Sequence, residues 1–223
     1  MGQDSSLGKR VVSAAKWSVA AQVIAKLVSP VTTMVLARLL TPSAFGIVAT
    51  ATMVTSLAEM ISDAGFQKYL IQHKFDSESD ESLSACVAFW ANLFIAVMLA
   101  AAIIAFNEEL SVLVGNPGLG FVLVISALAV PLTSLISVQT ALYQKHLDFK
   151  TLFGSRVGSS VTVLIVSVSL ALAGFSFWSM IMGNIAGSCV LALWLTAKSK
   201  WKPRLLFDFS QLKGMLSYGV WVL

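Results

Sequence analysis

The segment WSVAAQVIAKLVSPVTTMVLARLL, residues 17–40, decides the fold class of this chain. It is longer than the roughly 20 apolar residues that a helix needs to cross a bilayer. Polar residues nevertheless recur along it at steps of three and four, the spacing of one helix face: Ser18, Gln22, Lys26, Ser29 and Thr33. The segment therefore predicts a membrane-spanning helix with a polar stripe that contains a cation.

The composition of the whole chain agrees with a membrane protein. Of the 223 residues, 57% are hydrophobic and 12% are charged, whereas a soluble domain carries about 25% charge. The apolar residues come in blocks long enough to span a bilayer, which predicts an all-α, polytopic membrane protein. The net charge of +4 comes from residues between the blocks, so membrane topology explains it better than nucleic-acid binding.

Six apolar blocks predict six transmembrane helices, at about 17–40, 43–62, 83–106, 119–138, 157–173 and 179–197. Residues 1–16 form a polar N-terminal segment, and 198–214 form a basic linker. Residues 215–223 begin a seventh apolar segment that is too short to cross a membrane. We therefore expect this chain to be part of a longer protein.

The basic residues predict the orientation of these helices. Most of the 15 Lys and Arg residues precede the first span or fall in the stretches 63–82, 139–156 and 198–213. These stretches alternate with connections that are almost free of Lys and Arg. Because cytoplasmic loops are enriched in basic residues, the N-terminus and the basic linker are expected in the cytoplasm.

Lys26 is the most unusual residue of the predicted first span. It lies about nine residues into the helix, near mid-membrane, where a charge costs on the order of 2.5–3.5 kcal/mol. One interpretation is that Lys26, with Gln22 one turn before it, faces a water-filled cavity and attracts an anionic substrate group. The other is an ion pair with Glu59 of the second span. Arg38, near the outer end of the first helix, is either a second substrate-binding residue or an interfacial anchor.

Other predicted spans also carry polar residues at helical spacing. Thr52, Ser56, Glu59 and Asp63 share a face of the second helix, so Glu59 and Asp63 are candidates for ion coupling or an ion pair. Similar stripes occur in the fourth helix (Ser126, Thr133, Ser137, Thr140) and the fifth (Ser155, Ser159, Thr162, Ser169). Such stripes indicate either a polar cavity or hydrogen-bonded helix packing.

Small residues and prolines add predictions about packing and shape. Gly183 and Gly187 form a small-xxx-small pair in the sixth helix, which is typical of close helix–helix contact. Pro30 and Pro131 each remove a backbone hydrogen bond, so we expect kinks in the first and fourth helices.

The sequence does not predict an enzyme. It shows no Ser/His/Asp arrangement, no phosphate-binding glycine loop and no metal-ligand spacing. Cys86 and Cys189 lie inside apolar blocks, where packing is the expected role. We therefore expect no catalytic residues, no metal and no cofactor.

Several short stretches resemble a known family, and their order along the chain strengthens the resemblance. They are 36–46 (LARLLTPSAFG), 62–66 (SDAGF), 70–74 (LIQHK), 142–145 (LYQK) with 149–150 (FK), 174–178 (GFSFW) and 201–204 (WKPR). In this respect the chain, from about residue 9 to 223, is similar to the bacterial O-antigen and exopolysaccharide flippases. These belong to the multidrug/oligosaccharidyl-lipid/polysaccharide exporter superfamily.

The resemblance implies a two-lobe carrier, of which this chain would be the N-terminal lobe and the start of the second. It implies transfer of undecaprenyl-pyrophosphate-linked oligosaccharide across the bacterial inner membrane, without ATP hydrolysis by the protein. The implied partners are this lipid-linked oligosaccharide, the bilayer, and glycan polymerases and glycosyltransferases. Lys26 becomes the first candidate for binding the pyrophosphate, and Arg38 the second.

Two other functions stay open on the sequence. A cation-coupled multidrug exporter of the same superfamily would use a carboxylate in the cavity, for which Glu59 is the candidate. A non-transporting scaffold in a glycan-synthesis complex would not depend on any intramembrane charge.

Overall fold

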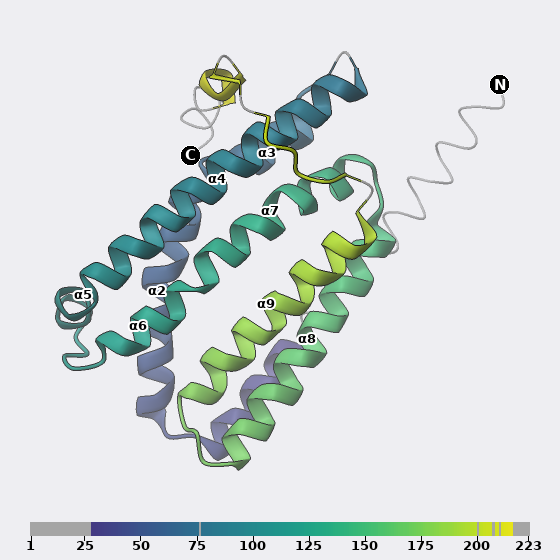
Figure 1. The fold of residues 1–223 in the computed structure, drawn as a ribbon. Helices are drawn as coiled ribbons and strands as arrows, with labels where there is room; N and C mark the ends of the chain where they lie inside the picture. The colour runs from purple at the N-terminus through teal and green to yellow at the C-terminus, as the bar shows by residue number, and fades with distance from the viewer. Residues whose placement is uncertain (1–27, 76, 200, 207, 210, 216–223) are drawn as a thin grey trace.

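The computed structural model of the chain describes residues 28–75, 77–199, 201–206, 208–209 and 211–215. All elements in these residues are helices (Figure 1). After an apolar helix at Val28–Leu39 they are α2 (Pro42–Asp63), α3 (Phe66–Gln72), α4 (Glu78–Ala105), α5 (Asn107–Leu113), α6 (Gly120–Ala127), α7 (Ala129–Lys145), α8 (Phe149–Leu172) and α9 (Trp178–Lys198).

Five of the expected membrane spans are present in the described residues. They are α2, α4, α6 together with α7, α8 and α9, each long and apolar enough to cross a bilayer. The all-α, polytopic class predicted from the sequence is therefore confirmed. The predicted first span is described only from Val28. Its first part, which contains Gln22 and Lys26, lies outside the described residues.

The long helices run beside one another with α3 at one end of the bundle and α5 at the other (Figure 1). We call these the α3 end and the α5 end. Successive long helices run in opposite directions, so the connections 64–77, 146–148 and 199–215 gather at the α3 end. The connections 106–119 and 173–177 lie at the α5 end.

Several helices extend into stretches that hydropathy predicted as loops. α4 begins at Glu78 rather than near 83, because the Ser77 side chain accepts a hydrogen bond from the Asp80 backbone N–H at 3.1 Å. The first turn also contains the acidic residues Glu78, Asp80 and Glu81, whose negative charge is stabilising near the positive end of the helix dipole. The predicted loop 63–81 thus holds α3 and the start of α4.

The same correction applies to two other predicted loops, 139–156 and 107–118. α8 begins at Phe149 rather than 157, because the Asp148 carboxylate accepts from both the backbone N–H and the hydroxyl of Thr151. α7 continues to Lys145 rather than ending at 138. The predicted loop 107–118 contains α5. Hydropathy marks where a helix leaves the membrane, whereas capping decides where it ends.

The predicted fourth span consists of two helices, α6 and α7, which meet at Leu128. Pro131 has no N–H to donate to the carbonyl oxygen of Ala127, the last residue of α6. The interruption therefore lies about one turn before the proline, as expected for a proline-induced break.

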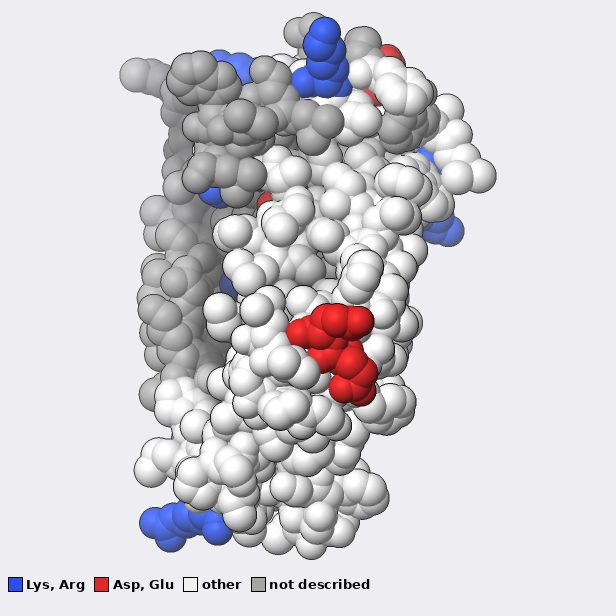
Figure 2. Space-filling model, turned by 90° about the vertical axis from the view of Figure 1, so that its left-hand side faces the viewer, with Lys and Arg blue, Asp and Glu red and all other residues white. Residues whose placement is uncertain are grey.

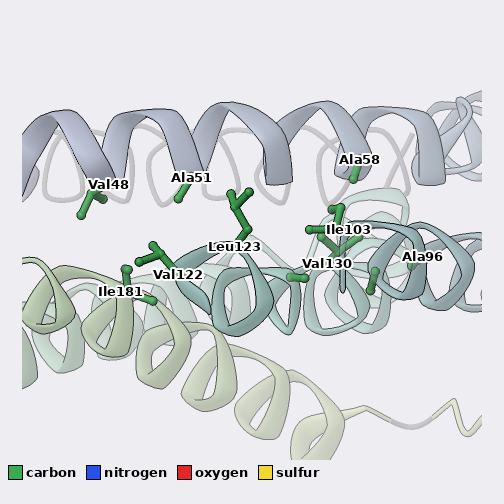
Figure 3. Packing of buried hydrophobic residues seen from close by; sticks show 11 residues of the cluster. Val48, Ala51, Ala58, Ala96, Ile103, Val122, Leu123, Val130 and Ile181 are labelled. Carbon is green, nitrogen blue, oxygen red and sulfur yellow. The ribbon is translucent and has the colours of Figure 1, made fainter. Parts of the chain in front are cut away.

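Small side chains bring α2 close to the rest of the bundle (Figure 3). Val48, Ala51 and Ala58 of α2 are buried against a cluster that includes Leu123 and Val130. Alanine at these positions allows the backbones to approach, as is common in membrane helix bundles.

The α8–α9 pair packs through the two predicted glycines. A Cβ atom built at Gly183 would collide with the Ser167 side chain, and one at Gly187 with Val163. The Ser159 hydroxyl donates a hydrogen bond to the Gly187 carbonyl oxygen at 2.8 Å. The small-xxx-small interpretation of Gly183 and Gly187 is therefore confirmed.

The described residues between 201 and 215, which we call the strap, pack against the bundle. The strap returns to the first half of α4, where Ser84 donates to Gln211 Oε1 at 2.8 Å and Gln211 Nε2 donates to Asp80 Oδ1 at 3.0 Å. Met215 is fully buried in a cluster with α3 and α4 residues. Part of the predicted basic linker is thus a packed element.

Candidate functional site

Polar side chains of α2 and α7 meet in the half of the bundle near the α3 end. α2 carries Glu59 and Asp63 one turn apart, both half-buried. On α7, Thr133 and Ser137 are also one turn apart and half-buried. Because residues four apart share a helix face, the two pairs can align along one helix–helix contact.

The contacts between these helices form two polar pairs. The Ser137 hydroxyl donates a hydrogen bond to Asp63 Oδ1 at 2.8 Å. The Thr133 hydroxyl lies near the Glu59 carboxylate, and it donates within α7 to the carbonyl oxygens of Ala129 and Val130 at 2.9 Å. We call Glu59, Asp63, Thr133 and Ser137 the α2–α7 polar site.

Local backbone geometry places Asp63 at this contact. α2 ends where Ala64 and Gly65 adopt left-handed conformations, with φ of 40° and 80°. Gly65 takes such a φ without steric cost, so the chain can turn sharply and begin α3 at Phe66. The turn keeps Asp63 as the last α2 residue, beside Ser137.

The polar site continues along α2 as an exposed stripe. Ser56 and Thr52, one and two turns before Glu59 on the same face, are exposed. A half-buried carboxylate in a membrane span is costly and needs a proton, a cation or hydrogen-bond donors. Two carboxylates with two hydroxyls could therefore bind and release a proton or a metal cation.

Arg38 is not part of this site. It is exposed near the end of the helix Val28–Leu39, just before α2 begins at Pro42. Glu59 lies 17 residues after Pro42, which is about 25 Å along an α-helix. The structure therefore separates Arg38 from Glu59 and Asp63.

Two of the predicted site residues, Gln22 and Lys26, lie outside the described residues. The predicted cavity role of Lys26 and its alternative pairing with Glu59 both stay predictions. Pro30 is exposed in the helix Val28–Leu39. The carbonyl oxygen that a proline at this position leaves unbonded belongs to Lys26. The kink predicted at Pro30 therefore lies outside the described residues.

Sequence reasoning missed two buried amides. Gln139, placed in a predicted loop, is buried in α7, and its Nε2 donates to Thr196 Oγ1 of α9 at 2.9 Å. Asn92 of α4 is fully buried, and neither of its amide atoms has a hydrogen-bond partner. The sequence signal that could have identified Asn92 is its position as the one polar residue within the apolar stretch 85–105.

Lys145 organises the α3 end. Its Nζ donates to the carbonyl oxygens of Leu70 at 3.0 Å and His73 at 2.7 Å, and it lies 3.8 Å from the centre of the Phe75 ring. Beside it, His146 Nε2 lies 2.9 Å from Glu81 Oε1. Burial, followed by the nearby charge of Asp80, raises the pKa of Tyr69 in α3, so this phenol stays neutral at physiological pH.

Charge is distributed unevenly over the surface (Figure 2). Most Lys and Arg in this view lie toward the α3 end, although basic atoms are also exposed at the opposite end. An acidic patch lies on the flank near α5, where Glu108 and Glu109 are exposed. Within the described part of the chain, no group of three or more His, Cys, Asp and Glu residues is placed to hold a metal ion.

Comparisons with known proteins agree on one family. A family model described as "Polysaccharide biosynthesis protein" matches residues 35–223. The succinoglycan biosynthesis transport protein ExoT of Rhizobium meliloti (strain 1021) is 34% identical over 194 residues, which are 85% of this chain and 38% of ExoT. No solved structure matches the chain.

Two further relatives cover almost the whole chain. The lipopolysaccharide biosynthesis protein WzxC of Escherichia coli (strain K12) is 26% identical over 97% of this chain and 44% of its own length. The teichuronic acid biosynthesis protein TuaB of Bacillus subtilis (strain 168) is 25% identical over 98% of this chain and 45% of its own length. The chain spans less than half the length of each of these relatives.

Proposed function

Because the chain belongs to the polysaccharide biosynthesis protein family, we propose that it forms the N-terminal half of a lipid-linked oligosaccharide flippase. The cargo would be an undecaprenyl-pyrophosphate-linked oligosaccharide or repeat unit, moved across the bacterial inner membrane. The relatives are named for three polymers, succinoglycan, lipopolysaccharide and teichuronic acid. They support a polysaccharide precursor as cargo without selecting its sugars.

The observation that carries this proposal is the family match over residues 35–223, which include all five described spans. The proposed role is that of a carrier and not of an enzyme. The proposed protein partners are glycosyltransferases, which would supply the cargo, and glycan polymerases, which would consume it. The α3 end, where Lys and Arg gather, would face the cytoplasm together with the N-terminus.

We assign candidate roles to the polar residues within this carrier. Lys26, with Gln22 beside it and Arg38 as a second cation, would bind the pyrophosphate. The α2–α7 polar site would bind a proton or cation whose gradient drives transport. The contact of Asp63 with Ser137 and the half-buried position of both carboxylates support this second role.

Export of surface polysaccharide in a deletion strain tests the proposal. The full-length protein should restore export, whereas Lys26→Ala and Asp63→Asn should each reduce it at least about tenfold, because each removes a charge that the transport cycle needs. Glu109→Gln is the matched control, since Glu109 is an exposed acid near the other end of the bundle. Immunoblots of the membrane fraction check that every variant is inserted.

Normal surface polysaccharide in cells with only the Lys26→Ala, Glu59→Gln or Asp63→Asn protein would overturn the assigned roles. Failure of the wild-type full-length protein to restore export would overturn the flippase itself. A drug-susceptibility panel on the same deletion strain would then test the multidrug alternative that Glu59 suggests.

A further inference from the structure

The strap combines exposed apolar and basic side chains with a backbone that is held in place. Leu205 is 84% exposed and Leu206 is 45% exposed. Lys202 and Arg204 just before them, and Lys213 after them, are also exposed, while Asp208 is half-buried. A stretch of this composition is unfavourable in water but favourable where acyl chains meet lipid headgroups.

Two hydrogen bonds to the strap backbone and one ring contact hold the strap against α4. The Trp90 indole Nε1 donates to the Arg204 carbonyl oxygen at 2.8 Å, and the Arg204 backbone N–H donates to Cys86 Sγ at 3.4 Å. The Trp201 ring packs edge-on against Phe89, with ring centres 5.9 Å apart. Residues 84–89 of α4 are all buried, so the strap and the bundle together cover this part of the helix on every side.

These contacts also set the depth of the strap in the membrane. The polar start of α4 ends at Ser84, and the residues from Ala85 to Ala105 are apolar except for Asn92. The hydrocarbon core corresponds to about 20 helical residues. Counted back from Ala105, this length ends at Cys86, the residue that Arg204 contacts. The exposed Leu205 and Leu206 therefore lie at the boundary between headgroups and acyl chains.

We propose that the strap is a membrane-surface anchor whose partner is an anionic phospholipid leaflet. Leu205 and Leu206 enter the boundary of the acyl chains, while Lys202, Arg204 and Lys213 contact lipid phosphates. The charge of the strap fits such a surface, because a basic residue near an anionic membrane strengthens association about fivefold. Figure 1 shows the strap passing from the end of α9 toward α4 at the α3 end. Figure 2 shows Lys and Arg gathered toward this end.

Depth-dependent fluorescence quenching tests this proposal without any transport assay. In the full-length protein, all cysteines except Cys86 are replaced by serine. Cys86 is fully buried and accepts the Arg204 N–H, and this background should take up no label. A single cysteine is then placed at Leu205, Lys74 or Phe94 and labelled with a polarity-sensitive dye. The labelled protein is reconstituted into phosphatidylglycerol vesicles that contain a nitroxide lipid. The nitroxide is either near the headgroup (shallow) or near the end of the acyl chain (deep), and it quenches dyes at its own depth.

The expected pattern differs among the three positions. A dye at Leu205 should be quenched about twofold more by the shallow nitroxide than by the deep one, as for an interfacial side chain. Phe94 is 68% exposed near the middle of the α4 span, so its dye should be quenched more by the deep nitroxide. Lys74 is exposed on the connection between α3 and α4, and its dye should respond weakly to both.

The basic residues are tested in the same vesicles. Lys202→Gln, Arg204→Gln and Lys213→Gln together should lower shallow quenching at Leu205 to the level seen in phosphatidylcholine vesicles. Lys68→Gln, Lys150→Gln and Arg156→Gln remove the same charge elsewhere at the α3 end and should leave that quenching unchanged. Equal losses in both variants would overturn the role given to the strap cations.

Two results at Leu205 would overturn the anchor. Weak quenching by both nitroxides with water-like emission, as expected at Lys74, would mean that the strap stays in water. Weak quenching with blue-shifted emission would mean that protein, rather than lipid, covers Leu205. The pattern at Phe94 shows in the same samples whether the protein is correctly embedded.

Discussion

At the residue scale, a tight constraint among the described residues is the absence of a side chain at Gly183. A Cβ atom there would lie 3.1 Å from Ser167 Cβ and 3.3 Å from the Ser167 backbone nitrogen, in addition to colliding with the hydroxyl. Rotation of the hydroxyl cannot relieve the two longer contacts, because the backbone of α8 itself is in the way.

Gly183→Ala should therefore destabilise the protein by about 1–3 kcal/mol, the usual range for overpacking. The matched control is Gly46→Ala in α2, where nothing lies within 4 Å of the new Cβ. That change should be neutral or stabilising by up to about 1 kcal/mol, because alanine favours the helix. Thermal unfolding of the detergent-solubilised variants measures both effects. A Gly183→Ala protein with the same melting temperature as the wild type would contradict the close α8–α9 contact.

At the element scale, short α3 depends on a residue from another helix. A seven-residue helix is too short to be stable alone. Phe66 and Leu70 are fully buried, and Lys145 of α7 donates to carbonyl oxygens near the end of α3. Lys145 thus supplies the positive charge that favours a helix C-terminus.

Lys145→Met should loosen α3 while leaving the long helices intact. Hydrogen bonds from a charged group contribute about 1.5–3 kcal/mol, so amide hydrogen exchange in 66–73 should become at least about tenfold faster. The control is Lys150→Met, which changes an exposed lysine of α8 and should not alter exchange in α3. Unchanged protection of α3 in the Lys145 variant would show that packing of Phe66 and Leu70 is sufficient.

At the scale of the whole molecule, the two ends of the bundle differ in charge. The α3 end holds the connections that carry Lys68, Lys74 and Lys202, whereas α5 carries Glu108 and Glu109. The positive-inside rule therefore favours one orientation, with the α3 end in the cytoplasm.

Cysteine labelling in intact cells checks this orientation. In the background that retains only Cys86, a cysteine at Glu109 should react with a membrane-impermeant maleimide added outside the cells. A cysteine at Lys74 should react only after the membrane is permeabilised, because the charge bias places it inside. The reverse pattern would invert the topology. Both positions are exposed, so accessibility alone does not distinguish them.

The sequence predicted the spans and the polar faces better than it predicted their partners. Hydropathy located α2 and α9 to within a residue or so, and glycine spacing identified the α8–α9 contact. Periodicity placed Glu59 and Asp63 on one face, and Thr133 and Ser137 on another. It could not show that these faces meet, because periodicity carries no information about which helices pack together.

Capped polar segments and long-range packing were the parts that sequence reasoning missed. The first turns of α4 and α8 are polar, so hydropathy assigned them to loops although Ser77 and Asp148 cap them. The strap was assigned to a linker because its basic residues are conspicuous, whereas its contacts with α4 depend on residues more than 100 positions away.

The strap has a further consequence for the order in which the protein is made. Trp90 and Arg204 are 114 residues apart, and Asp80 and Gln211 are 131 apart. At synthesis rates of about 5–20 residues per second, the ribosome needs on the order of 6–25 s to supply this partner after α4 has been made. During that interval, the face of α4 around Cys86 and Trp90 is uncovered by its native neighbour. A nascent chain held at the translocon or by a chaperone would need protection at this face until the strap is made.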